Sequence, residues 1–194
     1  MNAIRLFALT AVVATLATPI AASAAPSDAT GACTAPSRGL IAGIDMLFYR
    51  DAIGSEDDFE TYRGRVFSYH PFGSAFVLGA RLDGRAARGD VPFYQLPFVD
   101  LRGIPVMRYQ DENTAVAELE LRFALSSRWA LVGFGGDGRA WGARAGFGEA
   151  EDRFAGGVGV RYFLARRLGL WAGVDVARGP EEEAFYLQVG SAWR

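Results

Sequence analysis

The sequence has no lysine, one cysteine and one histidine among its 194 residues, and all 20 basic residues are arginine. A single cysteine, Cys33, excludes an intramolecular disulfide. With only His70 beside it, a zinc site is not expected either. The formal net charge of -2 provides no basic field for nucleic acid. We therefore expect no metal, no cofactor and no nucleic-acid partner.

Long apolar runs are missing after the N-terminus. An apolar stretch over residues 6–16 precedes Ala22-Ser23-Ala24, which fits the small-x-small pattern that signal peptidase cleaves. We interpret residues 1–24 as a secretory signal peptide and residues 25–38, rich in small and polar residues, as a flexible leader. No later segment approaches the roughly 18 apolar residues of a membrane helix. We expect an exported chain with one domain over residues 39–194.

The rest of the chain alternates with the two-residue period of β-strands, and its 24 glycines argue against long helices. The pattern predicts an all-β protein. The expected strands lie near residues 40–50, 59–69, 74–84, 114–123, 129–137, 153–163, 168–176 and 184–193.

Each expected strand has an apolar face and a face of glycines and charges, because successive side chains point to opposite sides. In residues 114–123, one face carries alanine, leucine and phenylalanine, and the other carries Glu118, Glu120 and Arg122. The charged face as a whole is expected to hold Arg81, Asp83, Glu118, Glu120, Arg122, Asp137, Arg161 and Asp175. These charges could compensate one another in a network that includes Arg81, Arg122, Arg161 and Asp175.

Two architectures fit this pattern. A soluble β-sandwich, which would make the chain an exported ligand-binding protein, buries its apolar faces. An antiparallel transmembrane β-barrel instead turns them toward lipid and keeps charges in the lumen. Export of the chain favours the barrel. So do the outward aromatic residues expected near strand ends, where interfacial girdles lie: Phe123, Phe154, Tyr162, Phe185 and, near the C-terminus, Trp193.

The order of the segments resembles one family. A loop that contains Arg102-Gly103-Ile104-Pro105 precedes the glutamate strand "AELELRF", which is followed by "GFGGDGRAW". This order resembles the C-terminal half of the bacterial surface antigen family of outer-membrane barrels, over roughly residues 60–194. That family includes the core subunit of the barrel-assembly machinery and the two-partner secretion transporters.

The resemblance implies a site. In that family a long extracellular loop folds back into the lumen, where its arginine docks against acidic residues of neighbouring strands. Here the arginine corresponds to Arg102, and the acidic partners correspond to Glu120 and Asp137. Gly103 would permit the tight turn that presents Arg102 inward. Ile104 stands where the family motif usually has an aromatic residue.

The resemblance also implies a role in inserting outer-membrane proteins or in translocating polypeptide, with outer-membrane lipid and unfolded polypeptide as partners. Family members have about twice as many strands. An eight-stranded barrel is filled by side chains, so the loop over residues 85–113 could hardly enter it. Three outcomes follow: a small barrel with the loop over its mouth, a half-barrel that pairs with a second copy, or a structural remnant.

The enzymatic alternative is a small barrel that acts on lipid through His70. A serine hydrolase would need a serine and an acidic group around the histidine. Ser68 and Ser74 lie near His70 in the sequence, but Pro71 suggests that the histidine lies at a strand end. We expect no catalytic residues.

Overall fold

A computed structural model describes residues 38–165, 170–190 and 193. The predicted signal peptide, Cys33 and all of the predicted leader except Arg38 lie outside these residues. The description therefore begins close to the start of the first strand.

Eight strands make up nearly all of the regular structure, as the alternation of the sequence predicts. They are β1 (Gly39–Tyr49), β2 (Phe59–Phe72), β3 (Phe76–Gly89), β4 (Asn113–Ala124), β5 (Trp129–Trp141), β6 (Arg153–Ala165), β7 (Leu170–Arg178) and β8 (Glu183–Val189). The described helices are two single turns, η1 (Asp51–Ile53) and η2 (Phe93–Gln95). Neither is long or apolar enough to cross a membrane.

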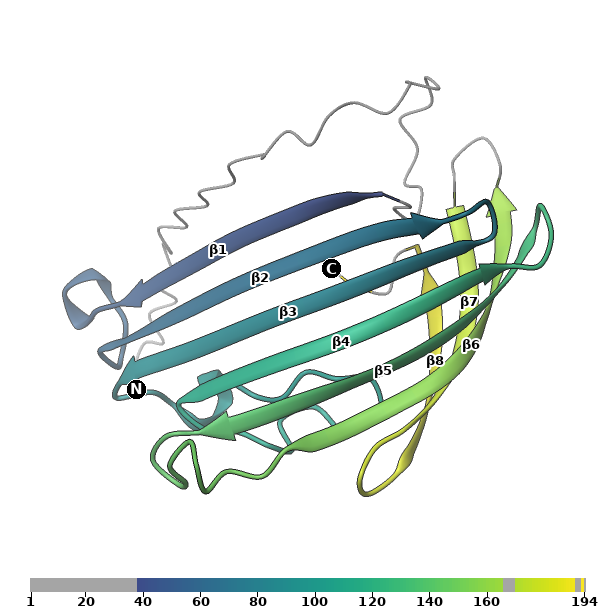
Figure 1. Cartoon of the computed structure of the whole chain (residues 1–194). Coiled ribbons are helices and arrows are strands. Elements are labelled where there is room, and N and C mark those ends of the chain that lie inside the picture. Colours follow the sequence, from purple (N-terminus) through teal and green to yellow (C-terminus); the bar gives the residue numbers. More distant parts are fainter. Residues whose placement is uncertain (1–37, 166–169, 191–192, 194) are drawn as a thin grey trace, which may run out of the picture.

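The strands form one antiparallel sheet in the order of the chain, from β1 to β8 (Figure 1). Within the described residues β1 pairs with β2 alone and β8 pairs with β7 alone. The prediction of an all-β antiparallel sheet of eight strands is thus confirmed. However, the sheet is open and does not close into a barrel. The described strands also form one layer, so the chain does not build the two packed sheets of a sandwich.

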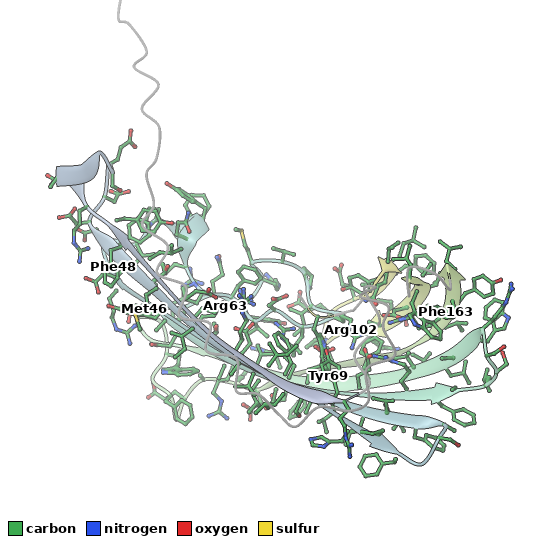
Figure 2. The ribbon with its side chains drawn as sticks, turned by 90° about the horizontal axis from the view of Figure 1, so that it is seen from above. Met46, Phe48, Arg63, Tyr69, Arg102 and Phe163 are labelled. Atoms are coloured by element: carbon green, nitrogen blue, oxygen red, sulfur yellow. The ribbon has the colours of Figure 1, made fainter. Side chains whose placement is uncertain are left out.

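The sheet is curved, and its two faces differ in chemistry. Figure 2 shows it as a trough with Arg102 inside. Strand register places Arg81, Glu118 and Gly136 of adjacent strands on this concave face. The opposite, convex face carries exposed apolar side chains from every strand. They include Leu40, Ile44, Met46, Phe48, Val66, Leu82, Leu119, Leu121, Leu131, Phe154, Val158, Val160, Val174, Val176, Phe185, Leu187 and Val189.

The core lies between the concave face and the β3–β4 connection. This connection comprises residues 90–112, because residues 85–89 extend β3 and residue 113 begins β4. Its buried Val99, Leu101 and Ile104 pack against Val116 of β4 and Ala155 of β6. We expected the loop over residues 85–113 to be too large for the interior of an eight-stranded barrel. Most of this loop instead lies against the concave face of an open sheet.

The longest connections all lie at one rim of the sheet. Residues 50–58, 90–112 and 142–152 connect strands at this rim, together with the four-residue turn 179–182, whereas the short turns 73–75 and 125–128 lie at the other. Because neighbouring strands are antiparallel, successive connections alternate between the rims. We call the first the long-loop rim and the second the short-turn rim.

Candidate functional site

Arg102 lies at the centre of the concave face. The flanking residues Leu101 and Ile104 are buried against the sheet and fix the position of the loop. The Arg102 side chain is only 9% exposed, although it belongs to a connection and not to a strand. A charged group this deeply buried requires partners.

Three carboxylates surround the Arg102 guanidinium. Its Nε donates a hydrogen bond of 2.7 Å to Oε1 of Glu118, and its Nη1 donates one of 3.2 Å to Oδ2 of Asp175. Its Nη2 lies 2.9 Å from Oε2 of Glu120. This last contact lies outside hydrogen-bond geometry, so it is an ion pair only. The planar guanidinium thus connects β4 with β7.

The fourth partner of Arg102 is an aromatic ring. The guanidinium carbon lies 3.5 Å from the ring centre of Phe134 in β5, a close cation–π contact. Burial alone would lower the pKa of Arg102. The carboxylates of Glu118, Glu120 and Asp175 outweigh that effect and raise the pKa, so Arg102 stays charged.

Each carboxylate around Arg102 is shared with a second arginine, and these three arginines belong to the charge network expected from the sequence. Arg81 lies 3.4 Å from Glu118, Arg122 lies 3.3 Å from Glu120, and Arg161 forms a bidentate pair with Asp175. The side chains of Glu118 and Asp175 are almost fully buried. The result is an alternating arrangement of opposite charges in which no carboxylate depends on Arg102 alone.

The cluster continues toward β1 through Asp83 and Asp100. Arg81 lies 3.0 Å from Asp83 and 3.1 Å from Asp100, and Arg85 lies 2.6 Å from Asp100. Arg63 of β2 lies 2.6 Å from Asp83. A cavity of about 490 Å³ adjoins this part of the cluster, between β1–β3 and residues 94–98. The concave face is thus polar well beyond the Arg102 cluster.

Gly103 brings the loop against the turn between β7 and β8. Its φ of +97° favours glycine, and an added Cβ would lie 3.0 Å from the carbonyl carbon of Arg178. Its N–H donates a 2.8 Å hydrogen bond to the Tyr186 hydroxyl. Nearby, Arg108 forms an ion pair of 2.7 Å with Glu181. The loop therefore spans the sheet from β3 to β8.

The two other residues of the loop motif have different roles. Ile104 is 5% exposed and belongs to the core beneath the loop. Pro105 is partly buried, and its carbonyl accepts a 3.2 Å hydrogen bond from the N–H of Arg108. Ile104 therefore supplies apolar packing at the position where the resemblance implies an aromatic residue.

Asp137 is not a partner of Arg102. In the register of β4 and β5 it lies opposite Ala117, on the convex face, whereas Phe134 and Gly136 lie on the concave face. The expectation that the apolar side of every strand faces outward is wrong for β5, whose buried apolar side lies on the concave face. In this strand, Ala130, Val132 and Phe134 are the buried, concave residues. Glu118 and Asp175 hold the positions beside Arg102 where Asp137 was expected.

Trp193 also lies elsewhere than expected. It is not an outward aromatic residue, because it packs on the concave side against Phe67 and Tyr69 and is 8% exposed. Its Nε1 donates a 3.0 Å hydrogen bond to Glu118. An added Cβ on Gly79 would lie 2.8 Å from the Trp193 ring, so this glycine leaves room for the indole. The last strand ends at Val189, short of the predicted residue 193.

His70, Ser68 and Ser74 lie near the short turn between β2 and β3. His70 is exposed near the end of β2. Within the described residues no hydrogen bond joins it to Ser68 or Ser74. The described part of the chain also holds no group of three or more His, Cys, Asp or Glu side chains placed to bind a metal ion.

Sequence reasoning missed several contributors to the site and its surrounding charge cluster, namely Phe134, Tyr186, Asp100, Arg63 and Arg85. The direct contact of Glu118 with Arg102 could have been found, because Glu118 precedes Glu120 by two residues and shares its face. The contacts of Phe134 and Tyr186 carry no local signal, since they depend on where the loop crosses the sheet. Comparisons of the chain with protein-family models and with curated proteins find no match.

Proposed function

We propose that this chain is an exported outer-membrane protein whose sheet forms part of a barrel wall. The convex face would contact lipid, and the Arg102 loop would brace the lumen side. By its resemblance to the surface antigen family, we assign it a role in inserting outer-membrane proteins or translocating polypeptide. The observation that carries the proposal is the apolar band on the convex face.

That band is continuous from one edge of the sheet to the other. Its middle is formed by residues such as Leu82, Leu119, Leu131, Val158 and Val174, which are 37–66% exposed. A water-soluble protein rarely exposes so large an apolar surface. The same pattern is required of strands that face lipid.

Charges on the convex face lie toward the long-loop rim. Among the described residues these include Glu60 near the start of β2, Arg88 near the end of β3 and Arg178 at the end of β7. Asp137 and Arg139 lie near the end of β5. A rim of charges and long loops opposite a rim of short turns is typical of outer-membrane barrels.

The concave face supports the lumen side of the proposal. Its ion pairs join β3, β4, β6 and β7 through side chains, in addition to the backbone ladder. A transported or inserted polypeptide would contact a polar surface whose charged side chains already hold the strands together through ion pairs. The Arg102 loop would hold the curvature of the wall and would not itself carry out a reaction.

Quenching by lipid tests the proposal. A fluorophore is attached to Leu119→Cys on the convex side of β4 and, as a matched control, to Leu47→Cys on the concave side of β1, both in a Cys33→Ser background. In outer-membrane vesicles, a quencher in the acyl chains should quench the Leu119 probe strongly and the Leu47 probe weakly. Equal quenching would contradict a lipid-facing convex side.

The polypeptide role needs a separate assay. Deleting the protein should lower the amounts of other barrel proteins in the outer membrane or block export of a polypeptide. Restoring the Arg102→Ala variant should rescue the defect only in part. Unchanged amounts of both in the deletion strain would overturn this role while leaving the membrane location intact.

A further inference from the structure

Within the described residues, the two edge strands of the sheet carry few features that would prevent pairing. β1 has eleven residues and β8 has seven, and within the described residues each is paired on one side only. Neither contains proline, and Asp45 is the sole charged residue of β1, where it pairs with Arg65 of β2. Permanently exposed edges normally carry charges, bulges or proline that prevent pairing. These edges are therefore suited to receive another strand.

The edges cannot receive one another within one chain while the loop stays in place. An eight-stranded barrel has room inside for side chains alone. Here the concave side also holds the backbone of residues 99–104. The fit is already tight, since a Cβ added to Gly138 would lie 2.3 Å from Val99, and one added to Gly136 would lie 2.7 Å from Leu101. Closing the barrel on itself would require expelling the buried Arg102 loop.

We propose that a second copy of this chain completes the barrel, with β1 of each copy pairing with β8 of the other. The number of strands supports this arrangement. In a sheet of eight strands in meander order, β1 and β8 run in opposite directions. A twofold axis along the barrel therefore sets β8 beside the partner's β1 in antiparallel orientation. Two copies give a closed ring of sixteen strands.

The convex side chains of the two edge strands are also chemically similar. The convex side chains of β1 include Ile44, Met46 and Phe48, and those of β8 include Phe185, Leu187 and Val189, with Glu183 at the first position of β8 opposite Arg178. Joining the edges would continue the apolar band without a break. One partner satisfies both edges at once, whereas a single added client strand would leave one edge open. A sixteen-stranded barrel is also wide enough for both Arg102 loops and an aqueous lumen.

The inference rests on the proposed function in one respect: lipid around the edges makes unpaired backbone groups costly. Location is therefore measured independently, by fractionating the same cells. A protein that is found in the membrane as a monomer would contradict the pairing with a second copy but not the proposed membrane function. A soluble protein would overturn the proposed membrane function, and the cross-linking below would still decide how its edges pair.

Cross-linking between differently tagged copies tests the pairing. In a Cys33→Ser background, one copy carries a cysteine on β1 (Ala42→Cys, Ile44→Cys or Met46→Cys) and the other carries one on β8 (Phe185→Cys or Leu187→Cys). At least one combination should form a disulfide between the two tags, since directly opposed strand residues lie within disulfide reach. Leu119→Cys, equally apolar and exposed in mid-sheet β4, is the matched control and should form none with β1.

Light scattering of the unmodified protein in mild detergent is the second measurement, and it needs no variant. The account predicts twice the mass of a single mature chain. A monomer mass would overturn it, as would a disulfide that forms within one chain carrying both cysteines. Cross-linking of the edges only to other polypeptides would assign them to client strands and would equally overturn the second copy.

Discussion

Replacing Arg102 with alanine tests how far the loop stabilises the sheet. The substitution removes contacts to three carboxylates and to the Phe134 ring, all on the concave face. Breaking a buried ion pair by removing one partner costs about 3–5 kcal/mol. Each carboxylate retains another arginine here, so we expect the lower end, about 3 kcal/mol. That corresponds to a change of roughly 100-fold in the ratio of unfolded to folded protein.

Urea unfolding of the purified protein in detergent, followed by tryptophan fluorescence, measures this loss. Arg108→Ala is the matched control, because Arg108 belongs to the same loop but its side chain is 54% exposed and pairs only at the surface with Glu181. It should leave stability nearly unchanged. A loss for Arg102→Ala no greater than that of Arg108→Ala would refute the structural role of the cluster.

A double-mutant cycle extends the test to the partners of Arg102. Arg102→Ala combined with Glu120→Gln should lose less than the sum of the single losses, by more than about 0.5 kcal/mol, because the two side chains share one interaction. Arg102→Ala combined with Asp137→Asn should be additive, because Asp137 lies on the other face. Coupling of Arg102 with Asp137 and not with Glu120 would contradict the register of β5.

Three further predictions concern the loop and the C-terminus. Gly138→Ala, beneath the loop, should cost about 1–3 kcal/mol of unfolding free energy, whereas Gly133→Ala, with open space around its Cβ on the convex side of the same strand, should be nearly neutral in the same urea titration. Trp193→Phe should cost about 1.5–3 kcal/mol by removing the hydrogen bond to Glu118, and urea unfolding followed by circular dichroism with no such loss would contradict the assigned contact. Hydrogen bonds from Arg108 and then Tyr109 lower the pKa of Glu181 from its ordinary 4.5, so its contact with the loop should be complete above that pH and be lost as the pH falls below it. An NMR titration of Glu181 with a midpoint at or above 4.5 would contradict this.

Local pattern was sufficient to predict the fold class and most strands. Alternation of side chains is a property of each segment alone, and seven of the eight strands lie close to their expected ranges. β8 ends at Val189, short of the expected residue 193, and Trp193 packs inward against Phe67 and Tyr69. Nothing in the sequence near Trp193 distinguishes an inward aromatic residue from an outward one, because the indole depends on the space left by the distant Gly79.

Residues of the candidate site could be predicted where strand alternation alone determined which face of the sheet they occupy. Glu120, Arg81, Arg122, Arg161 and Asp175 lie on the concave face as expected. The assignment of Asp137 failed because β5 carries apolar residues on both faces, and Val132 and Phe134 on the concave face pack against Ala177 of β7. Whether the sheet closes into a barrel could not be predicted from local alternation either, because closure depends on whether the concave side has room for the loop.

Outer-membrane fractionation, with the protein run on a mild-detergent gel before and after boiling, tests the central claim most directly. The account predicts that the protein is recovered in the outer membrane and that its band shifts on boiling, because a membrane-embedded sheet sealed at both edges stays folded until heated. Recovery from the soluble periplasm with no shift on boiling would contradict it.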